Sequence, residues 1–185
     1  MNKGLVYLLV LVLVVFIRVA AWAQESTYRL GPGDILEISV WKDESLSREI
    51  IVPPDGVISF PLIKDIDGTS LTVTKLREIV TKKLEEYIPD ATVTVMLLKA
   101  DSLTAYVIGK VNKPGQFPIT LETNVMQALS MAAGLNPFAD SDKIIILRQE
   151  NGKNIKIPFD YDEVKKGENL EQNILLRRGD VVVVP

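Results

Sequence analysis

The sequence predicts an α+β fold made of two small consecutive units, residues 26–100 and 103–185, behind an export signal at residues 1–23. Three observations predict this fold. Apolar residues alternate along several short segments, as they do in β-strands. Turn sequences rich in glycine separate these segments. Two stretches, one beginning at Thr74 and one after Thr123 or Asn124, instead carry apolar residues at helical spacing.

The N-terminus has the three regions of a secretory signal. Lys3 supplies a positive charge, residues 4–17 are uninterruptedly apolar, and Ala21-Trp22-Ala23 offers the small side chains that signal peptidase accepts before Gln24. Arg18 ends the apolar run before it reaches the ~20 residues needed to span a bilayer. Cleavage is therefore favoured over retention as a membrane anchor, and the mature protein is expected to begin at Gln24.

The sequence contains no cysteine and no histidine. This composition excludes a lipidated cysteine, disulfides, and zinc sites built on thiolate or imidazole. It also excludes cysteine nucleophiles and serine hydrolysis through a histidine base. The chain has 21 basic and 24 acidic residues without a prominent basic cluster, which argues against a nucleic-acid partner.

The first unit is expected to contain several strands and one helix. A Gly31-Pro32-Gly33 turn should start a strand, and Asp55-Gly56 should turn a hairpin between residues 50–52 and 57–60. A helix should begin at Thr74, which can cap it, and end before Pro89. The β-branched segment 92–98 is expected to be a central strand.

The second unit is expected to open with two strands joined at Pro114-Gly115, with Gly115 at positive φ. A short helix should follow, closed by Gly134. Asn151-Gly152 then predicts a hairpin between residues 143–148 and 154–159. Strand, strand, helix, strand, strand is the element order of a β-grasp.

Four acidic residues are candidates for a glycoside-cleaving pair, because that reaction needs two carboxylates on opposite sides of a bond. The candidates are Asp34, Asp55, Asp65 and Asp67. Three of them adjoin turns or glycines, where aspartate bonds to nearby backbone groups, so turn roles are favoured. The repeated Leu-x-x-Gly-Asp at residues 30–34 and 176–180 has the same interpretation. No catalytic residue, metal site or cofactor is predicted.

Four segments in consecutive order resemble the bacterial polysaccharide export protein family. They are Tyr28–Leu36, Val52–Leu62, Val107–Gly115 with Ala128–Gly134, and Leu176–Pro185. The resemblance implies a polysaccharide export domain at residues 26–100 and one soluble ligand-binding β-grasp (SLBB) domain at residues 103–185, with a core at 103–150 and a closing strand at 176–185. Larger members also carry a lipobox cysteine, further β-grasp domains and a pore-forming C-terminal helix, which this sequence does not show. Only the periplasmic part of such a channel is therefore expected.

The resemblance implies a non-enzymatic component of capsular or exopolysaccharide export. It would act in the periplasm, associated with the outer membrane through partners and without a lipid anchor. The implied partners are a polysaccharide, further copies of the chain in a ring, an inner-membrane polysaccharide copolymerase and a separate outer-membrane β-barrel. A monomeric periplasmic glycan-binding module and a carbohydrate-active enzyme remain as alternatives, the enzyme being the least favoured.

Candidate residues for glycan or subunit contact are few. Trp41 near a strand end could stack on a sugar ring, although a large aromatic residue in such a place more often packs. Lys110 and Lys113 flank the Pro-Gly turn and are expected to be exposed, and Gln116 follows that turn.

Overall fold

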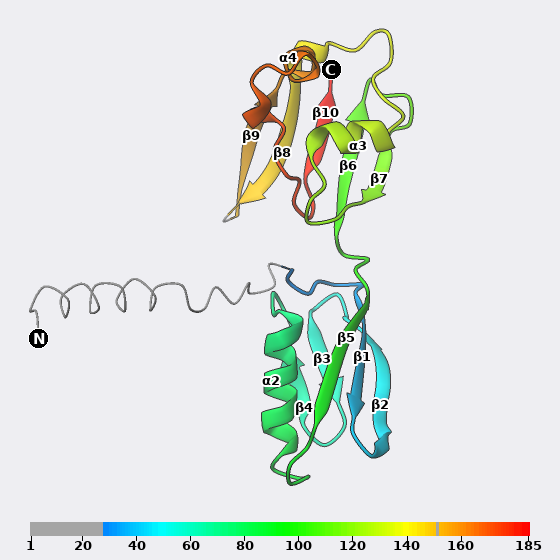
Figure 1. The fold of residues 1–185 in the computed structure, drawn as a ribbon, viewed down its shortest axis with the longest axis vertical. Helices are drawn as coiled ribbons and strands as arrows, with labels where there is room; N and C mark the ends of the chain where they lie inside the picture. The colour runs from blue at the N-terminus through cyan, green and yellow to red at the C-terminus, as the bar shows by residue number, and fades with distance from the viewer. Residues whose placement is uncertain (1–27, 151) are drawn as a thin grey trace, which may run out of the picture.

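The computed structural model describes residues 28–150 and 152–185 (Figure 1). The predicted export signal lies outside these residues. The N-terminal unit contains β1 (Ile35–Val40), β2 (Asp43–Ile51), β3 (Val57–Phe60), β4 (Lys64–Asp67), α2 (Val73–Leu84) and β5 (Val93–Lys99). The C-terminal unit contains β6 (Thr104–Gly109), β7 (Gly115–Pro118), α3 (Val125–Met131), β8 (Ile144–Glu150), β9 (Lys153–Phe159), α4 (Tyr161–Lys166) and β10 (Val181–Val184), with 3₁₀ turns at Ser141–Lys143 and Leu170–Gln172. These elements confirm the predicted α+β class.

The N-terminal unit is a three-stranded antiparallel sheet of order β2-β1-β5 covered by α2 (Figure 1). The alternation of β1 buries Leu36, Ile38 and Val40 on one face of the sheet. α2 completes this core with Leu76, Val80 and Leu84, which recur every four residues and are fully buried. The hairpin of β3 and β4 adds Ile58 and Phe60 to the same cluster.

Strand pairing in this unit differs from the prediction in two places. The expected hairpin around Asp55-Gly56 is wrong, because β2 pairs with β1 and β3 pairs with β4. Gly56 does turn the chain, with φ of +74° and its N–H bonded to the Pro53 carbonyl, but this turn leads from one sheet to another. Segment 92–98 forms β5 at the sheet edge, since β1 takes the central position between β2 and β5.

The helix of this unit begins two residues earlier than predicted. Thr72, not Thr74, is the N-cap: its backbone is extended and its Oγ1 accepts a hydrogen bond from the Lys75 N–H at 3.1 Å. The helix ends at Leu84, ahead of Pro89. Both threonines are suitable N-caps, so the start of the helix depends on where the preceding turn ends.

The C-terminal unit is a five-stranded sheet of order β7-β6-β10-β8-β9. The last strand, β10, lies in the middle, parallel to β6 and antiparallel to β8. α3 packs on one face through Val125, Ala128 and Leu129, all buried. Its N-cap is Asn124, whose side chain and that of Gln127 form a capping box. The predicted hairpin is confirmed in its strands, β8 and β9, which pair from Ile144 with Phe159 to Glu150 with Lys153.

The connection between β6 and β7 does not turn at Pro114-Gly115. Gly115 is the first residue of β7, pairs with Val107, and does not have positive φ. The positive φ, +92°, belongs to Gly109, where a Cβ would overlap the Val184 carbonyl oxygen. Residues 110–113 then run to the end of α3, where the Asn112 and Lys113 N–H groups bond to the carbonyls of Gly134 and Ala132.

The two Gly-Asp motifs form the same turn, in agreement with the interpretation favoured from the sequence. Gly33 and Gly179 both have positive φ, and the aspartate that follows each is buried. Asp34 accepts a hydrogen bond from the Gly31 N–H, and Asp180 accepts one from the Arg177 N–H, both at 2.8 Å. Each carboxylate thus closes its own turn directly before a strand.

These turns also join the two units. Asp34 accepts hydrogen bonds from the Tyr28 hydroxyl at 2.6 Å and from the Ser102 N–H at 2.9 Å. Arg178, from the second turn, donates to the Arg29 carbonyl at 2.6 Å, and its Cζ lies 5.8 Å from the centre of the Tyr28 ring. A Cβ at Gly31 would overlap the Arg178 guanidinium. Glycine at position 31 therefore makes room for this contact.

We expect Gly109→Ala to destabilise the protein by about 1–3 kcal/mol, because alanine is strained at this φ and its Cβ overlaps β10. Gly115→Ala is the matched control and should change stability by less than about 1 kcal/mol, since a Cβ there meets nothing nearer than 3.9 Å. Chemical denaturation, with hydrogen exchange of β6 and β10 amides, measures both. Equal losses in the two variants would contradict the assignment of the strained position to Gly109.

Burial, together with the hydrogen bond to Asp34, raises the pKa of Tyr28 from 10.0 to about 12. A raised folded-state pKa means that the protonated hydroxyl contributes stability below pH 10, and that this contribution is lost as pH rises towards 12. Tyr28→Phe should therefore cost about 1.5–3 kcal/mol at pH 8, by loss of a hydrogen bond to a carboxylate. The difference from wild type should shrink between pH 10 and 12 in urea denaturation. A difference that stays constant over that range would contradict this role.

Candidate functional site: an apolar sheet face and a polar hollow

An exposed apolar surface, here called the outer face, lies on the side of the C-terminal sheet opposite α3. Its six side chains come from the three inner strands β6, β10 and β8: Tyr106, Ile108, Val181, Val183, Ile145 and Leu147. Tyr106, Ile108 and Leu147 are 39–43% exposed, and the other three are half-buried. The residues between them on these strands, such as Val107, Val182 and Ile146, are fully buried on the side that α3 covers.

Strand register explains how these residues come together. Val181 pairs with both Tyr106 and Leu147, and Val183 pairs with both Ile108 and Ile145, so two apolar rows cross the sheet. Paired residues of neighbouring strands point to the same face. Gln116 on β7 and Lys156 on β9 extend the first row at its two ends. The outer face is therefore an apolar strip with a polar residue at each edge.

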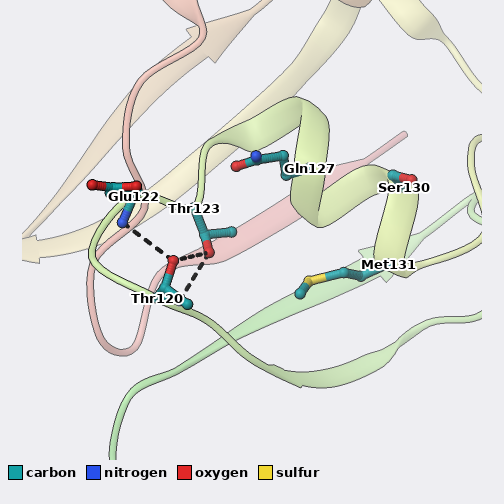
Figure 2. Close-up of a pocket in the computed structure, with 6 residues that line it drawn as sticks. All are labelled: Thr120, Glu122, Thr123, Gln127, Ser130 and Met131. Carbon is teal, nitrogen blue, oxygen red and sulfur yellow. Dashed lines mark hydrogen bonds between the residues drawn. The ribbon is translucent and has the colours of Figure 1, made fainter.

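A polar hollow, here called the α3 hollow, lies on the opposite side of the unit. It has a volume of about 320 Å³ and is lined by Thr120, Glu122, Thr123, Gln127, Ser130 and Met131 (Figure 2). The loop that leads into α3 is held by Thr123, whose Oγ1 accepts the Thr120 N–H at 2.8 Å. Figure 2 shows Glu122 at one end of the hollow and Met131 at the other. Met131 is 44% exposed, so one end of the hollow is apolar.

The structure does not bring the predicted contact residues together. Trp41 is 72% exposed in the turn between β1 and β2. Figure 1 shows this turn at the end of the N-terminal unit remote from the C-terminal unit. Lys110 and Lys113 are exposed on the connection from β6 to β7. Gln116 adjoins the outer face and donates a hydrogen bond to the Thr104 Oγ1 at 3.1 Å. Of the four residues, only Gln116 flanks one of the two surfaces described above.

The outer face was not among the predicted sites, although the sequence carries a signal for it. Residues 144–147 and 181–184 are continuous apolar runs, which are typical of strands covered on both faces. In the C-terminal unit α3 covers only one face of the sheet. The apolar side chains of these two runs that point to the other face therefore form the outer face.

The acidic candidates occupy local roles. Asp55 accepts the Val57 N–H at 3.0 Å, and Asp65 accepts the Ser59 hydroxyl at 2.6 Å. The Thr69 hydroxyl and N–H bond to Asp67 and lower the pKa of that carboxyl. Asp34, Asp55 and Asp67 thus accept nearby backbone N–H groups, as the favoured turn role predicts, whereas Asp65 bonds to a side-chain hydroxyl on the neighbouring strand.

Two protein-family profiles match consecutive parts of the chain. The profile described as polysaccharide biosynthesis/export protein matches residues 23–98, and the SLBB domain profile matches residues 103–184. Among the described residues, none of the helices combines the length and apolar character needed to cross a membrane.

Several curated proteins are similar over most of this chain. The EPS I polysaccharide export outer membrane protein EpsA of Ralstonia nicotianae is 28% identical over 88% of this chain and 48% of its own length. The capsule polysaccharide export outer membrane protein CtrA of Neisseria meningitidis is 26% identical over 86% of this chain and 44% of its own length. The polysialic acid transport protein KpsD of Escherichia coli is 26% identical over 85% of this chain and 28% of its own length.

The chain thus spans about half the length of EpsA and CtrA and less of KpsD. All three relatives are named for the export or transport of a polysaccharide, and the two profiles account for both units of the fold in order. On this combined evidence the chain belongs to the bacterial polysaccharide export protein family, with an export domain followed by an SLBB domain in the residues matched.

Proposed function

We propose that this protein is a periplasmic, non-enzymatic component of capsular or exopolysaccharide export, and that several copies form a ring that guides the polymer towards a separate outer-membrane partner. The observation that carries this proposal is the consecutive match to an export domain and an SLBB domain in a chain whose relatives are named as polysaccharide exporters. The proposed partners are the polysaccharide, an inner-membrane copolymerase and an outer-membrane β-barrel. The predicted signal at residues 1–23 supports export.

The outer face supports the assembly of several copies. A strip of six apolar side chains left open in a single chain is what a protein–protein contact would cover. Tyr106 is the one aromatic ring among these six side chains, and the amides on the same side, Gln116, Gln149 and Asn154, lie at its margins. Trp41, Lys110 and Lys113 remain proposed contacts with glycan or with other copies.

The two units are further proposed to be separate domains, with residues 26–100 and 103–185 as their bounds. Each has its own sheet and its own covering helix. The connection between β5 and β6 passes through Asp101 and Ser102.

A second candidate function is a monomeric glycan-binding module, favoured by the α3 hollow. Hydroxyl, amide and carboxylate groups line this hollow, and they are the groups that bind sugars. This candidate requires neither a ring nor the outer face as a contact.

Oligomeric state separates the two candidates. Size-exclusion chromatography with light scattering on the purified mature chain should give a mass several times that of one copy. Dilution should shift the mass towards that of one copy, because a contact between copies depends on concentration. A single-copy mass at every concentration, together with glycan binding, would favour the monomeric module.

Deleting the gene should abolish surface polysaccharide while polymer synthesis inside the cell continues, because an export component acts after synthesis. Immunoblotting of surface and intracellular polysaccharide measures both pools, and re-expression of the wild-type chain is the control. Surface polysaccharide at the parental level in the deletion strain would refute a role in export.

A further inference from the structure

We propose that a cavity where the two units meet binds one acidic sugar residue, with Arg178 receiving the carboxylate of the sugar and Asp55 one of its hydroxyls. The inference rests on the proposed export of a polysaccharide and names the class of sugar that this polymer carries. The site is separate from both the outer face and the α3 hollow.

The cavity, here called the joint cavity, has a volume of about 160 Å³. Parts of three N-terminal segments line it, within residues 30–32, 52–56 and 68–70, and Arg178 lines it from the C-terminal unit. Pockets for drug-sized ligands usually start at about 300 Å³, so the joint cavity suits a single sugar ring and not a longer segment.

Two buried glycines give the polar side chains of the joint cavity their room. A Cβ at Gly31 would overlap the Arg178 guanidinium, and a Cβ at Gly56 would overlap the Thr69 hydroxyl. Arg178 and Thr69 both line the cavity. Any larger residue at these two positions would therefore displace a group that faces the ligand.

Arg178 has donors left for a carboxylate. A guanidinium carries five N–H groups, and that of Arg178 makes two hydrogen bonds among the described residues, to the carbonyls of Arg29 and Leu30 at 2.6 and 3.4 Å. None of the ion pairs between described residues includes Arg178, whereas its neighbour Arg177 pairs with Glu150 at 2.8 Å. The two carbonyls orient the guanidinium in advance, and a carboxylate is a stronger acceptor than either of them.

The charges around the joint cavity favour a sugar that has both a carboxylate and hydroxyls. Arg29 donates to the carbonyl of Ser70, which lines the cavity, so a second guanidinium lies at its rim. Asp55 is the one carboxylate in the lining, and beyond the Val57 N–H it retains acceptor positions for a hydroxyl. A sugar acid supplies a partner to Arg178 and to Asp55, whereas a neutral sugar or a simple carboxylate supplies only one.

The rest of the lining suits the body of a sugar ring. Its apolar part consists of Leu30, Pro32, Val52 and Pro54. These side chains can contact the C–H groups of the ring, as apolar side chains do in most small-ligand sites. The α3 hollow is less suited to an acidic sugar, because Glu122 is the one charged residue in its lining and repels a carboxylate.

Titration of the full mature chain with three small ligands tests the site. Glucuronate has a sugar ring and a carboxylate, glucose has only the ring, and acetate has only the carboxylate. We expect glucuronate to shift the NMR signals of the Gly31, Gly56 and Gly68 amides, with a dissociation constant of about 1–10 mM for a ligand of this size. Glucose and acetate should each bind about fivefold more weakly or worse. Ionic strength is held constant, because salt screens exposed charges.

Two arginine variants separate the joint cavity from general charge attraction. Arg178→Gln should lower the affinity for glucuronate to that for glucose, while the unchanged affinity for glucose shows that the cavity is intact. Arg177→Gln is the matched control and should bind all three ligands as wild type does, because Arg177 lies in the same turn but pairs with Glu150. If Arg178→Gln also loses glucose, the comparison of the three ligands on the wild-type chain decides alone.

An aspartate variant tests the other end of the cavity. Asp55→Ala should weaken glucuronate and glucose but not acetate, because only the two sugars place a hydroxyl against this carboxylate. Thermal unfolding without ligand checks the fold of each variant. Equal weakening of all three ligands would contradict the role given to Asp55.

Each remaining result refutes the site. Equal affinities for glucuronate and glucose would refute the choice of an acidic sugar, and equal affinities for glucuronate and acetate would refute a sugar site. Shifts confined to the α3 hollow, or no shifts at saturating concentrations, would refute the joint cavity as the place of binding. The export role stands or falls separately, by deletion of the gene.

Discussion

The buried ion pair between Arg148 and Asp180 holds the C-terminal sheet in its order. Arg148 on β8 donates to Asp180 through Nε and Nη2, the latter at 2.6 Å, and its Nη2 also reaches the Leu175 carbonyl. Both side chains are at least nine-tenths buried, so removal of either would leave an uncompensated charge inside the protein. The pair fastens the turn before β10 to β8, and β10 is the strand that joins β8 to β6. Both the outer face and the support of α3 depend on that central position.

The turn that carries Asp180 has a counterpart in the N-terminal unit, and the two differ in what their carboxylates bind. Asp34 has neutral donors, Tyr28, Gly31 and Ser102, where Asp180 has a guanidinium. Arg178, from the second turn, reaches the backbone beside the first. The same Gly-Asp turn thus precedes a strand in each unit. Side chains from these two turns, Asp34 and Arg178, also make the hydrogen bonds that hold the two units together.

The surfaces of the C-terminal unit divide their chemistry between the two sides of one sheet. The outer face carries apolar rows, whereas hydroxyl, amide and carboxylate groups line the α3 hollow on the other side.

The sequence by itself determined the fold class, the family and most of the local turns, because the alternation of β1, the Gly-Asp turns and the Asn124 cap depend on neighbours within a few residues. Tertiary structure decided which strands pair. Asp55-Gly56 is a turn in either arrangement. Whether β3 pairs with β2 or with β4 depends on how the two sheets pack into one core, which local sequence does not reveal. It also decided that Gly109, not Gly115, takes positive φ, because β10, about 75 residues along the chain, passes beside Gly109. The outer face escaped prediction for the same reason: an apolar run does not reveal which of its two faces another element will cover.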